Sequence, residues 1–248
     1  MTYRSITAGE VTFAGANGDQ VQAYLAQPAG DHPVGGVVVI HHMPGWDEGS
    51  VEISRKFAHY GYNAICPNLF HRFGEGEPDE VAAVARSRSG KSDDETVGDV
   101  AGAAAYLRGL PTSNGKVGII GFCSGGRQVV LVASRLDNLD AAVDCWGGRV
   151  IADADQLTES HPVAPFDLTA DLAAPLLGIF GNDDRSPTPE QVDQHEAALK
   201  EHGKTYEFHR YDGAGHGFFA VNRPGYRPEQ ATEAWREVFK WYGTYLAS

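Results

Sequence analysis

The sequence predicts an α/β fold with a mostly parallel central sheet of about eight strands and helices on both faces. Three observations support this prediction. Short apolar runs recur along the chain, longer polar segments with helical spacing separate them, and most runs are apolar at successive positions. Strands with this pattern are buried on both faces, as they are when helices cover both sides of a parallel sheet.

The expected strands can be assigned in chain order. Residues 10–28, "EVTFAGANGDQVQAYLAQP", form two partly alternating runs around a Gly-Asp turn, which is typical of a hairpin. Six further runs follow, at 35–42, 62–67, 116–121, 141–147, 175–181 and 204–211. These eight segments make up the predicted sheet.

Two helices have clear signals at their ends. Thr188 and Gln191 occupy capping-box positions, Pro189 stands at the first helical position, and Gly203 marks the end. A C-terminal helix is expected over 228–246, where apolar residues recur at helical spacing: Ala234, Val238, Trp241 and Tyr242.

The length of 248 residues fits one large domain, and we expect a single domain over 1–248. No repeat or interdomain linker interrupts it. The least regular part, 71–95, is interpreted as an insertion over one end of the sheet and a possible lid.

Charge and composition narrow the classes of partner. With 33 acidic and 20 basic residues the formal net charge is −13, which argues against nucleic acid or an anionic membrane as partner. No segment approaches the roughly 20 apolar residues that cross a bilayer, and the N-terminus lacks a signal-peptide pattern. We therefore expect a cytoplasmic protein with a small-molecule partner, and the oligomeric state stays open.

The segment "GIIGFCSGGRQVV", residues 118–130, places Cys123 between a strand and a helix. Glycines at 121 and 125 leave room for a sharp turn, and the helix that follows directs its free N–H groups and positive dipole end at the thiol. This is the pattern of a nucleophile elbow with cysteine in place of serine. The alternative is a small buried cysteine at a tight turn.

The remaining cysteines serve as internal controls. Cys66 and Cys145 lie inside apolar runs without flanking glycines, so we expect both to be buried. The three cysteines form no CxxC pair, and neither a disulfide framework nor a metal site is expected.

A nucleophilic thiol needs a base and an acid that orients it, which follow the nucleophile along the chain in this arrangement. "IFGNDDRSP" places Asp183 and Asp184 after a strand, and spacing favours Asp184 without excluding Asp183. "YDGAGHGFF" places His216 between two glycines after the last strand. Another histidine, His209, lies within a strand and is interpreted as structural.

An oxyanion hole requires two N–H donors near the nucleophile. The backbone N–H groups of Ser124 and Met43 are the candidates, since Pro44 has no N–H. His41 and His42 could instead be metal ligands with Asp47 or Glu48, but adjacent residues of a strand point to opposite sides, so no metal site is expected.

Taken together, these motifs resemble the dienelactone hydrolase family, carboxymethylenebutenolidase-like α/β hydrolases. The resemblance spans the chain and rests on "VVVIHHMPGWDE", "GYNAICPNLFHR", "GIIGFCSGGR", "GIFGNDDRSP" and "GAGHGF". It implies an α/β-hydrolase fold and ester or lactone hydrolysis through a thioester acyl-enzyme without a cofactor. Cys123 would be the nucleophile, Asp184 the orienting acid and His216 the base and then the acid.

Two departures from the family pattern concern the substrate. The resemblance implies a glutamate before the oxyanion-hole residue, where this chain has His42, and an arginine four residues after the histidine, where it has Ala220. Both positions bear on dienelactone binding, so dienelactone and other small esters or lactones both stay open as substrates. Arg86, Arg88 or Arg223 could replace the missing arginine. The predicted substrate contacts are His42, Trp46, Arg86, Arg88 and Phe218.

Two other function classes stay open at this point. A ligand-binding protein could keep a hydrolase pocket without turnover, which the two departures would allow. A thiol redox protein would need a second cysteine near Cys123 to resolve a sulfenic acid, and no cysteine has suitable sequence spacing.

Overall fold

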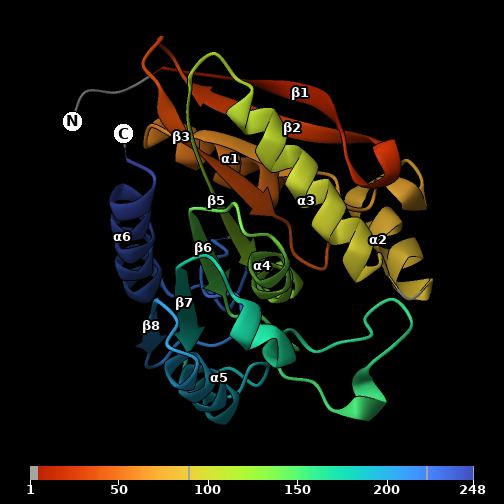
Figure 1. Cartoon of the computed structure of the whole chain (residues 1–248), viewed down its shortest axis with the longest axis vertical. Coiled ribbons are helices and arrows are strands. Elements are labelled where there is room, and N and C mark those ends of the chain that lie inside the picture. The colour runs from red at the N-terminus through yellow and green to blue at the C-terminus, as the bar shows by residue number, and fades with distance from the viewer. Residues whose placement is uncertain (1–4, 89, 222, 248) are drawn as a thin grey trace.

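The computed structural model describes residues 5–88, 90–221 and 223–247 (Figure 1). Its centre is an eight-stranded sheet with the strand order β1-β2-β4-β3-β5-β6-β7-β8. The strands are β1 (Ile6–Ala14), β2 (Gln20–Pro28), β3 (Val34–Ile40), β4 (Asn63–Pro67), β5 (Ser113–Phe122), β6 (Ala141–Cys145), β7 (Leu176–Gly181) and β8 (Tyr206–Tyr211). β2 is antiparallel to both of its neighbours, and the other pairs are parallel.

The predicted strands and the α/β class are confirmed, since every predicted run overlaps a strand of this sheet. The expected hairpin is formed by β1 and β2, paired from Ile6↔Pro28 to Ala14↔Gln20. A short 3-10 turn, η1 (Ala16–Gly18), joins them.

Helices cover both faces of the sheet. Their bounds are α1 (Glu48–His59), α2 (Pro78–Ser87), α3 (Asp93–Arg108), α4 (Ser124–Arg135), α5 (Pro189–Glu201) and α6 (Pro228–Tyr245). Buried residues of α3, α4 and α5 belong to one hydrophobic cluster, and those of α1 and α6 belong to a second. Helices α3, α4 and α5 therefore pack on one face of the sheet, and α1 and α6 pack on the opposite face. In Figure 1, α3 and α4 lie in front of the strands.

Strand β3 shows why the strand runs are continuously apolar. Val38 and Ile40 belong to the cluster under α3 and α4, whereas Val37 and Val39 belong to the cluster under α1 and α6. Alternate side chains of a strand point to opposite faces, and here both faces are covered. All four side chains have no exposed surface.

The helix signals are confirmed at α5. The Thr188 side chain accepts a hydrogen bond from the Gln191 N–H, the Gln191 side-chain oxygen accepts one from the Thr188 N–H, and Pro189 is the first helical residue. The expected C-terminal helix is α6, with Ala234, Val238, Trp241 and Tyr242 buried. No helix within the described ranges is both long and apolar enough to span a membrane.

The segment 71–95 is more regular than the sequence indicates. It contains the 3-10 turn η2 (His71–Phe73), helix α2 and the first turn of α3. α2 was missed because its buried face is made of small residues, Ala82 and Ala85, which pack against Phe70. The segment lies over the loop after β3, since a Cβ added to Gly45 would lie 3.3 Å from both the Phe70 ring and the Pro78 carbonyl oxygen. A lid function for this segment stays a prediction.

Candidate active site

Cys123 occupies the sharp turn between β5 and α4. Its φ of +56° and ψ of −117° lie outside the common regions for a residue with a side chain, and such strain persists only where the surroundings enforce it. Its N–H donates to the Cys145 carbonyl at 3.1 Å, and its carbonyl accepts from the Gly126 N–H at 3.0 Å. The turn is therefore held by the neighbouring strand β6 and by the first turn of the helix.

The elbow glycines have the steric role predicted for them. A Cβ added to Gly121 would lie 2.2 Å from the Gly125 carbonyl oxygen. A Cβ added to Gly125 would lie 2.5 Å from the Ile40 carbonyl oxygen and 2.8 Å from that of His41. Because every one of these contacts is with backbone, no side-chain rotation could relieve them, and only glycine fits at both positions.

Asp184 and His216 come together at the same edge of the sheet. His216 Nδ1 lies 2.9 Å from Asp184 Oδ2, and the other carboxylate oxygen accepts the Ser186 N–H at 2.9 Å. Asp184 is buried, whereas Asp183 is exposed. Of the two aspartates that the sequence offers, Asp184 is the one that contacts the imidazole of His216.

The contacts of His216 favour its charged form. Hydrogen bonds to Asp184 and then to Cys123 raise the pKa of His216 to about 10, against the opposing effect of partial burial. The imidazole thus lies between the carboxylate and the thiol. These contacts therefore favour the charged form of the imidazole.

The two predicted oxyanion donors lie on segments that meet at the elbow. Ser124 is the first residue of α4, so its N–H is one of those that a helix leaves without an internal acceptor. Met43 follows β3 by three residues, and the end of β3 touches Gly125 through the Ile40 and His41 carbonyl oxygens. The Ser124 N–H thus directly follows Cys123, whereas the structure gives Met43 no contact with Cys123, and its role as second donor stays a prediction.

The adjacent histidines have different surroundings. His41 is buried, with Nδ1 2.9 Å from the His42 carbonyl oxygen and Nε2 accepting the Leu69 N–H, and burial lowers its pKa to about 3. His42 is half-buried, and its Nε2 lies 2.7 Å from Asp47 Oδ2. Burial opposes the ionisation of Asp47, but its contacts with His42 and its hydrogen bonds from Ser50 together outweigh burial and lower the Asp47 pKa to about 2.

The predicted substrate contacts are not all near one another. Trp46 is half-buried and lines an open groove, whereas Arg86 and Arg88 are exposed at the end of α2. Phe218 has no exposed surface, and its ring packs against Trp146 with centroids 5.1 Å apart. The prediction of Phe218 as a substrate contact is corrected, because its side chain belongs to the core below the site.

The groove beside Trp46 has a volume of about 410 Å³. Its wall combines aromatic rings with neutral amide and hydroxyl side chains and a few titratable groups. The lining residues are Thr12, Gln20, Gln22, Trp46, Asn68, Phe70, His71, Gly74, Glu75, Gly76, Pro78 and Val81. The β1–β2 hairpin, the loop after β3 and the segment 71–95 thus all border the groove.

Cys66 and Cys145 are buried, as predicted. Burial raises the pKa of both thiols, so neither forms a thiolate readily. Two residues near the site were not singled out from the sequence. Trp146 packs with its ring centroid 6.4 Å from that of His216, and Asp144 is a fully buried carboxyl group on β6. An aspartate inside the apolar run "AAVDCWG" is the signal that could have drawn attention to this place.

A parallel sheet with a cysteine elbow after β5, an aspartate after β7 and a histidine after β8 has the architecture of an α/β hydrolase. The chain belongs to the dienelactone hydrolase family, whose model matches residues 21–246. It is accordingly a dienelactone hydrolase-like hydrolase, a class with small-molecule substrates.

Relatives and solved structures agree with this assignment. A "Putative carboxymethylenebutenolidase" of Salmonella typhimurium is 34% identical, over 97% of this chain and 88% of the relative. A protein of the same name from Methylorubrum extorquens is 33% identical, over 97% of this chain and 82% of the relative. The crystal structure titled "Putative Dienelactone Hydrolase" from Klebsiella pneumoniae is 30% identical, with a TM-score of 0.88 over 97% of this chain and 100% of that chain.

Proposed function

We propose that this chain hydrolyses a small ester or lactone through an acyl-cysteine intermediate, with Cys123 as nucleophile, His216 as base and acid, and Asp184 as the group that orients the imidazole. One observation carries the proposal: His216 is hydrogen bonded to Asp184 at 2.9 Å and also contacts the Cys123 thiol. That is the arrangement required for proton transfer to and from a nucleophile.

In the first half-reaction the Cys123 thiolate attacks the substrate carbonyl carbon, and the carbonyl oxygen takes the negative charge. The N–H groups of Ser124 and Met43 stabilise this oxyanion. When the C–O bond breaks, the His216 imidazolium donates its proton to the leaving alkoxide. A thioester remains on Cys123; with a lactone substrate, the new hydroxyl stays attached to the acyl group.

In the second half-reaction water attacks the thioester. Acylation has removed the thiolate, so one of the contacts that raise the His216 pKa is lost and the neutral imidazole can accept a proton from the water. The tetrahedral intermediate collapses, the C–S bond breaks, and the acid product leaves. Thiolate and imidazolium are then restored.

The surroundings favour an uncharged substrate. Ala220 offers no cation four residues after His216, and His42 is already paired with Asp47. The groove beside Trp46 carries neutral amides and hydroxyls with a single glutamate, Glu75, among its lining residues. We propose that an uncharged polar portion of the substrate lies there, and that carboxylate-bearing lactones are poorer substrates.

The nucleophile is tested with Cys123→Ala and Cys123→Ser. We expect Cys123→Ala to have no esterase activity, and wild type mixed with an activated ester to gain one acyl mass on Cys123 in intact-mass spectrometry. Persistent hydrolysis by Cys123→Ala would contradict the proposal. A trapped acyl group would also exclude a protein that only binds the ligand.

The orienting acid is tested with an adjacent matched pair. Asp184→Asn leaves His216 without its carboxylate and should lower kcat by roughly 10³-fold or more. Asp183→Asn alters an exposed neighbour and should leave kcat unchanged. Equal effects of the two substitutions would refute this assignment.

The substrate class is tested with matched neutral and carboxylate-bearing esters and lactones, dienelactone included. We expect higher kcat/KM for the neutral member of each pair. Gln22→Leu, which removes a neutral amide from the groove, should raise KM for polar esters and leave acetate esters unaffected. A general preference for the carboxylate-bearing member would contradict this part of the proposal.

A further inference from the structure

Asp144 is a buried carboxyl group directly behind the nucleophile elbow. It lies on β6 opposite Gly121 of β5, the first glycine of the elbow. It has no exposed surface, and its Oδ1 accepts the Gly147 N–H at 2.7 Å. Within the described ranges its other oxygen, Oδ2, has no hydrogen-bond partner.

The carboxyl group occupies space that two glycines leave free. A Cβ added to Gly126 on α4 would lie 2.3 Å from Asp144 Oδ1, and one added to Gly147 would lie 2.5 Å from the same atom. The third glycine of the sequence "GFCSGG" therefore lets the nucleophile helix approach Asp144. This contact joins α4 to the turn that follows β6.

That turn is strained and touches the catalytic histidine. Trp146 has a φ of +43° and Arg149 a φ of +63°, both in the left-handed region although neither is glycine. The Trp146 ring packs beside His216, with centroids 6.4 Å apart, and against Phe219 at 4.9 Å. The hydrogen bond from Gly147 to Asp144 holds the residue next to Trp146 in place.

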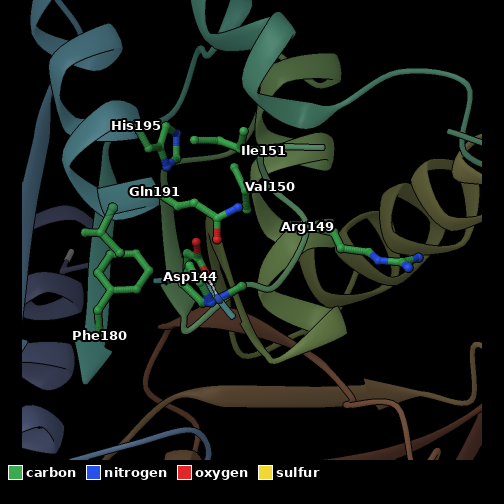
Figure 2. A pocket seen from close by; sticks show the side chains of 10 residues that line it. Asp144, Arg149, Val150, Ile151, Phe180, Gln191 and His195 are labelled. Atoms are coloured by element: carbon green, nitrogen blue, oxygen red, sulfur yellow. Dashed lines mark hydrogen bonds between the residues drawn. The ribbon is translucent and has the colours of Figure 1, made fainter. Parts of the chain in front are cut away.

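Asp144 also faces a small space of about 10 Å³, which Figure 2 shows with its lining side chains. Most of the wall is apolar. The lining residues are Asp144, Gly147, Arg149, Val150, Ile151, Phe180, Pro187, Gln191, Val192 and His195. In Figure 2 the Asp144 carboxyl group points into this space, below Gln191 and His195.

Among the residues that the structure describes, no charged group on the surrounding elements is placed to compensate an ionised Asp144. From α5, His195 is 3% exposed, and burial lowers its pKa to about 4, so it is neutral near pH 7. From the turn, Arg149 directs its side chain away from Asp144 (Figure 2). From α4, Arg127 holds Asp93 through two hydrogen bonds, and the neighbouring Cys145 thiol on β6 is neutral because burial raises its pKa.

We infer that Asp144 is a positioning residue of the active site, which in its uncharged form holds the Trp146 turn against the base of the nucleophile helix. Through its contacts with Gly147 and Gly126, Asp144 fixes the distance between the Cys123 elbow and the Trp146 ring that packs beside His216. An ionised carboxylate in this apolar surrounding would have to draw in water or shift the turn. Burial raises the Asp144 pKa to about 7, against the smaller effect of the Gly147 hydrogen bond, so the change falls near neutral pH.

The inference rests on Cys123 being the reactive thiol of the proposed function, and the test uses two readouts to keep the two ideas apart. The rate of Cys123 alkylation by iodoacetamide needs no turnover, whereas ester hydrolysis does. Both are measured for wild type, Asp144→Asn and Asp144→Ala between about pH 5 and about pH 9. Asp140→Asn is the matched control, because Asp140 lies at the other end of β6 and also accepts a backbone N–H, from Val117 at 2.7 Å.

Asp144→Asn keeps the acceptor for Gly147 and cannot ionise. We expect the ratio of its alkylation rate to that of wild type to be near one at acid pH and about ten at about pH 8. The ratio rises because only about a tenth of wild-type Asp144, with a pKa of about 7, is still protonated at that pH. Asp144→Ala should alkylate more slowly at every pH and lower kcat with little change in KM.

A ratio for Asp144→Asn that stays flat with pH, or an equal rise for Asp140→Asn, would overturn the inference. If Asp144→Asn does not fold, Asp144→Ala decides alone, and a wild-type alkylation rate for that variant would likewise overturn it. If the alkylation rates follow the expected pH profiles but none of the proteins hydrolyses an ester, the proposed function is refuted and the positioning role of Asp144 stays supported.

Discussion

Replacement of Gly125 by alanine tests the steric account of the elbow. The added Cβ would lie 2.5 Å from the Ile40 carbonyl oxygen and 2.8 Å from that of His41, so backbone must separate by about half an ångström or more. Forcing extra carbon into a packed site costs roughly 1 to 3 kcal/mol, and rigid backbone on both sides places this case at the upper end. Alanine recovers about 1 kcal/mol through its higher helix propensity. The expected net loss in unfolding free energy is about 2 kcal/mol.

The assay is urea unfolding at neutral pH, with Gly243→Ala as the matched control. Gly243 is also a helical glycine, on α6, but an added Cβ there meets nothing within 4 Å. Its replacement should therefore stabilise the protein by up to about 1 kcal/mol. Cys123 alkylation should slow only in Gly125→Ala, because only that change displaces the nucleophile helix. An unfolding free energy of Gly125→Ala equal to or above that of wild type would refute the steric account.

Three further predictions concern charged groups. Asp93→Asn breaks the buried ion pair with Arg127, so the guanidinium stays buried without its carboxylate. In urea titrations the unfolding free energy should fall by about 3 kcal/mol or more. A loss below about 1 kcal/mol would contradict this expectation. The His216 pKa is raised in the folded protein, so its stabilising effect is fully present below about pH 6.5 and is lost as the pH rises through about 10. The stability difference between wild type and His216→Asn should shrink over that interval, and a constant difference would count against the contact. Burial opposes ionisation of Asp99, but hydrogen bonds from its partners, Arg72 among them, lower its pKa to about 2. The stability that wild type has over Asp99→Asn should therefore shrink as the pH falls from about 4 to about 2, which thermal unfolding can measure.

Most of the fold could be predicted from the sequence because the strands are buried on both faces. Residues such as Val37 and Val38 contact different layers of helices, so a continuous apolar run has one physical explanation. The capping box at Thr188 is equally local, since both of its hydrogen bonds lie within one turn. Helix α2 has no comparable signal, because its buried contacts are made by alanines.

The candidate site could be predicted as a set of residues but not as a set of contacts. Asp183 and Asp184 are neighbours in the chain, and only the turn after β7 decides that Asp184 is buried beside His216. Phe218 is two residues from His216 and nevertheless lies in the core, within a turn in which the Ala220 N–H donates to the Gly217 carbonyl. The role inferred for Asp144 depends on the approach of two glycines from separate segments, which no local pattern shows.

Cys123, Asp184 and His216 follow β5, β7 and β8, and long crossover segments separate these strands in the chain. Parallel pairing of this kind needs contacts between distant residues, which form slowly during folding. These three side chains therefore meet only after the C-terminal half of the sheet has assembled. In refolding experiments, the return of rapid Cys123 alkylation should lag behind the return of helical circular dichroism, so that thiol reactivity reports the completion of the native topology.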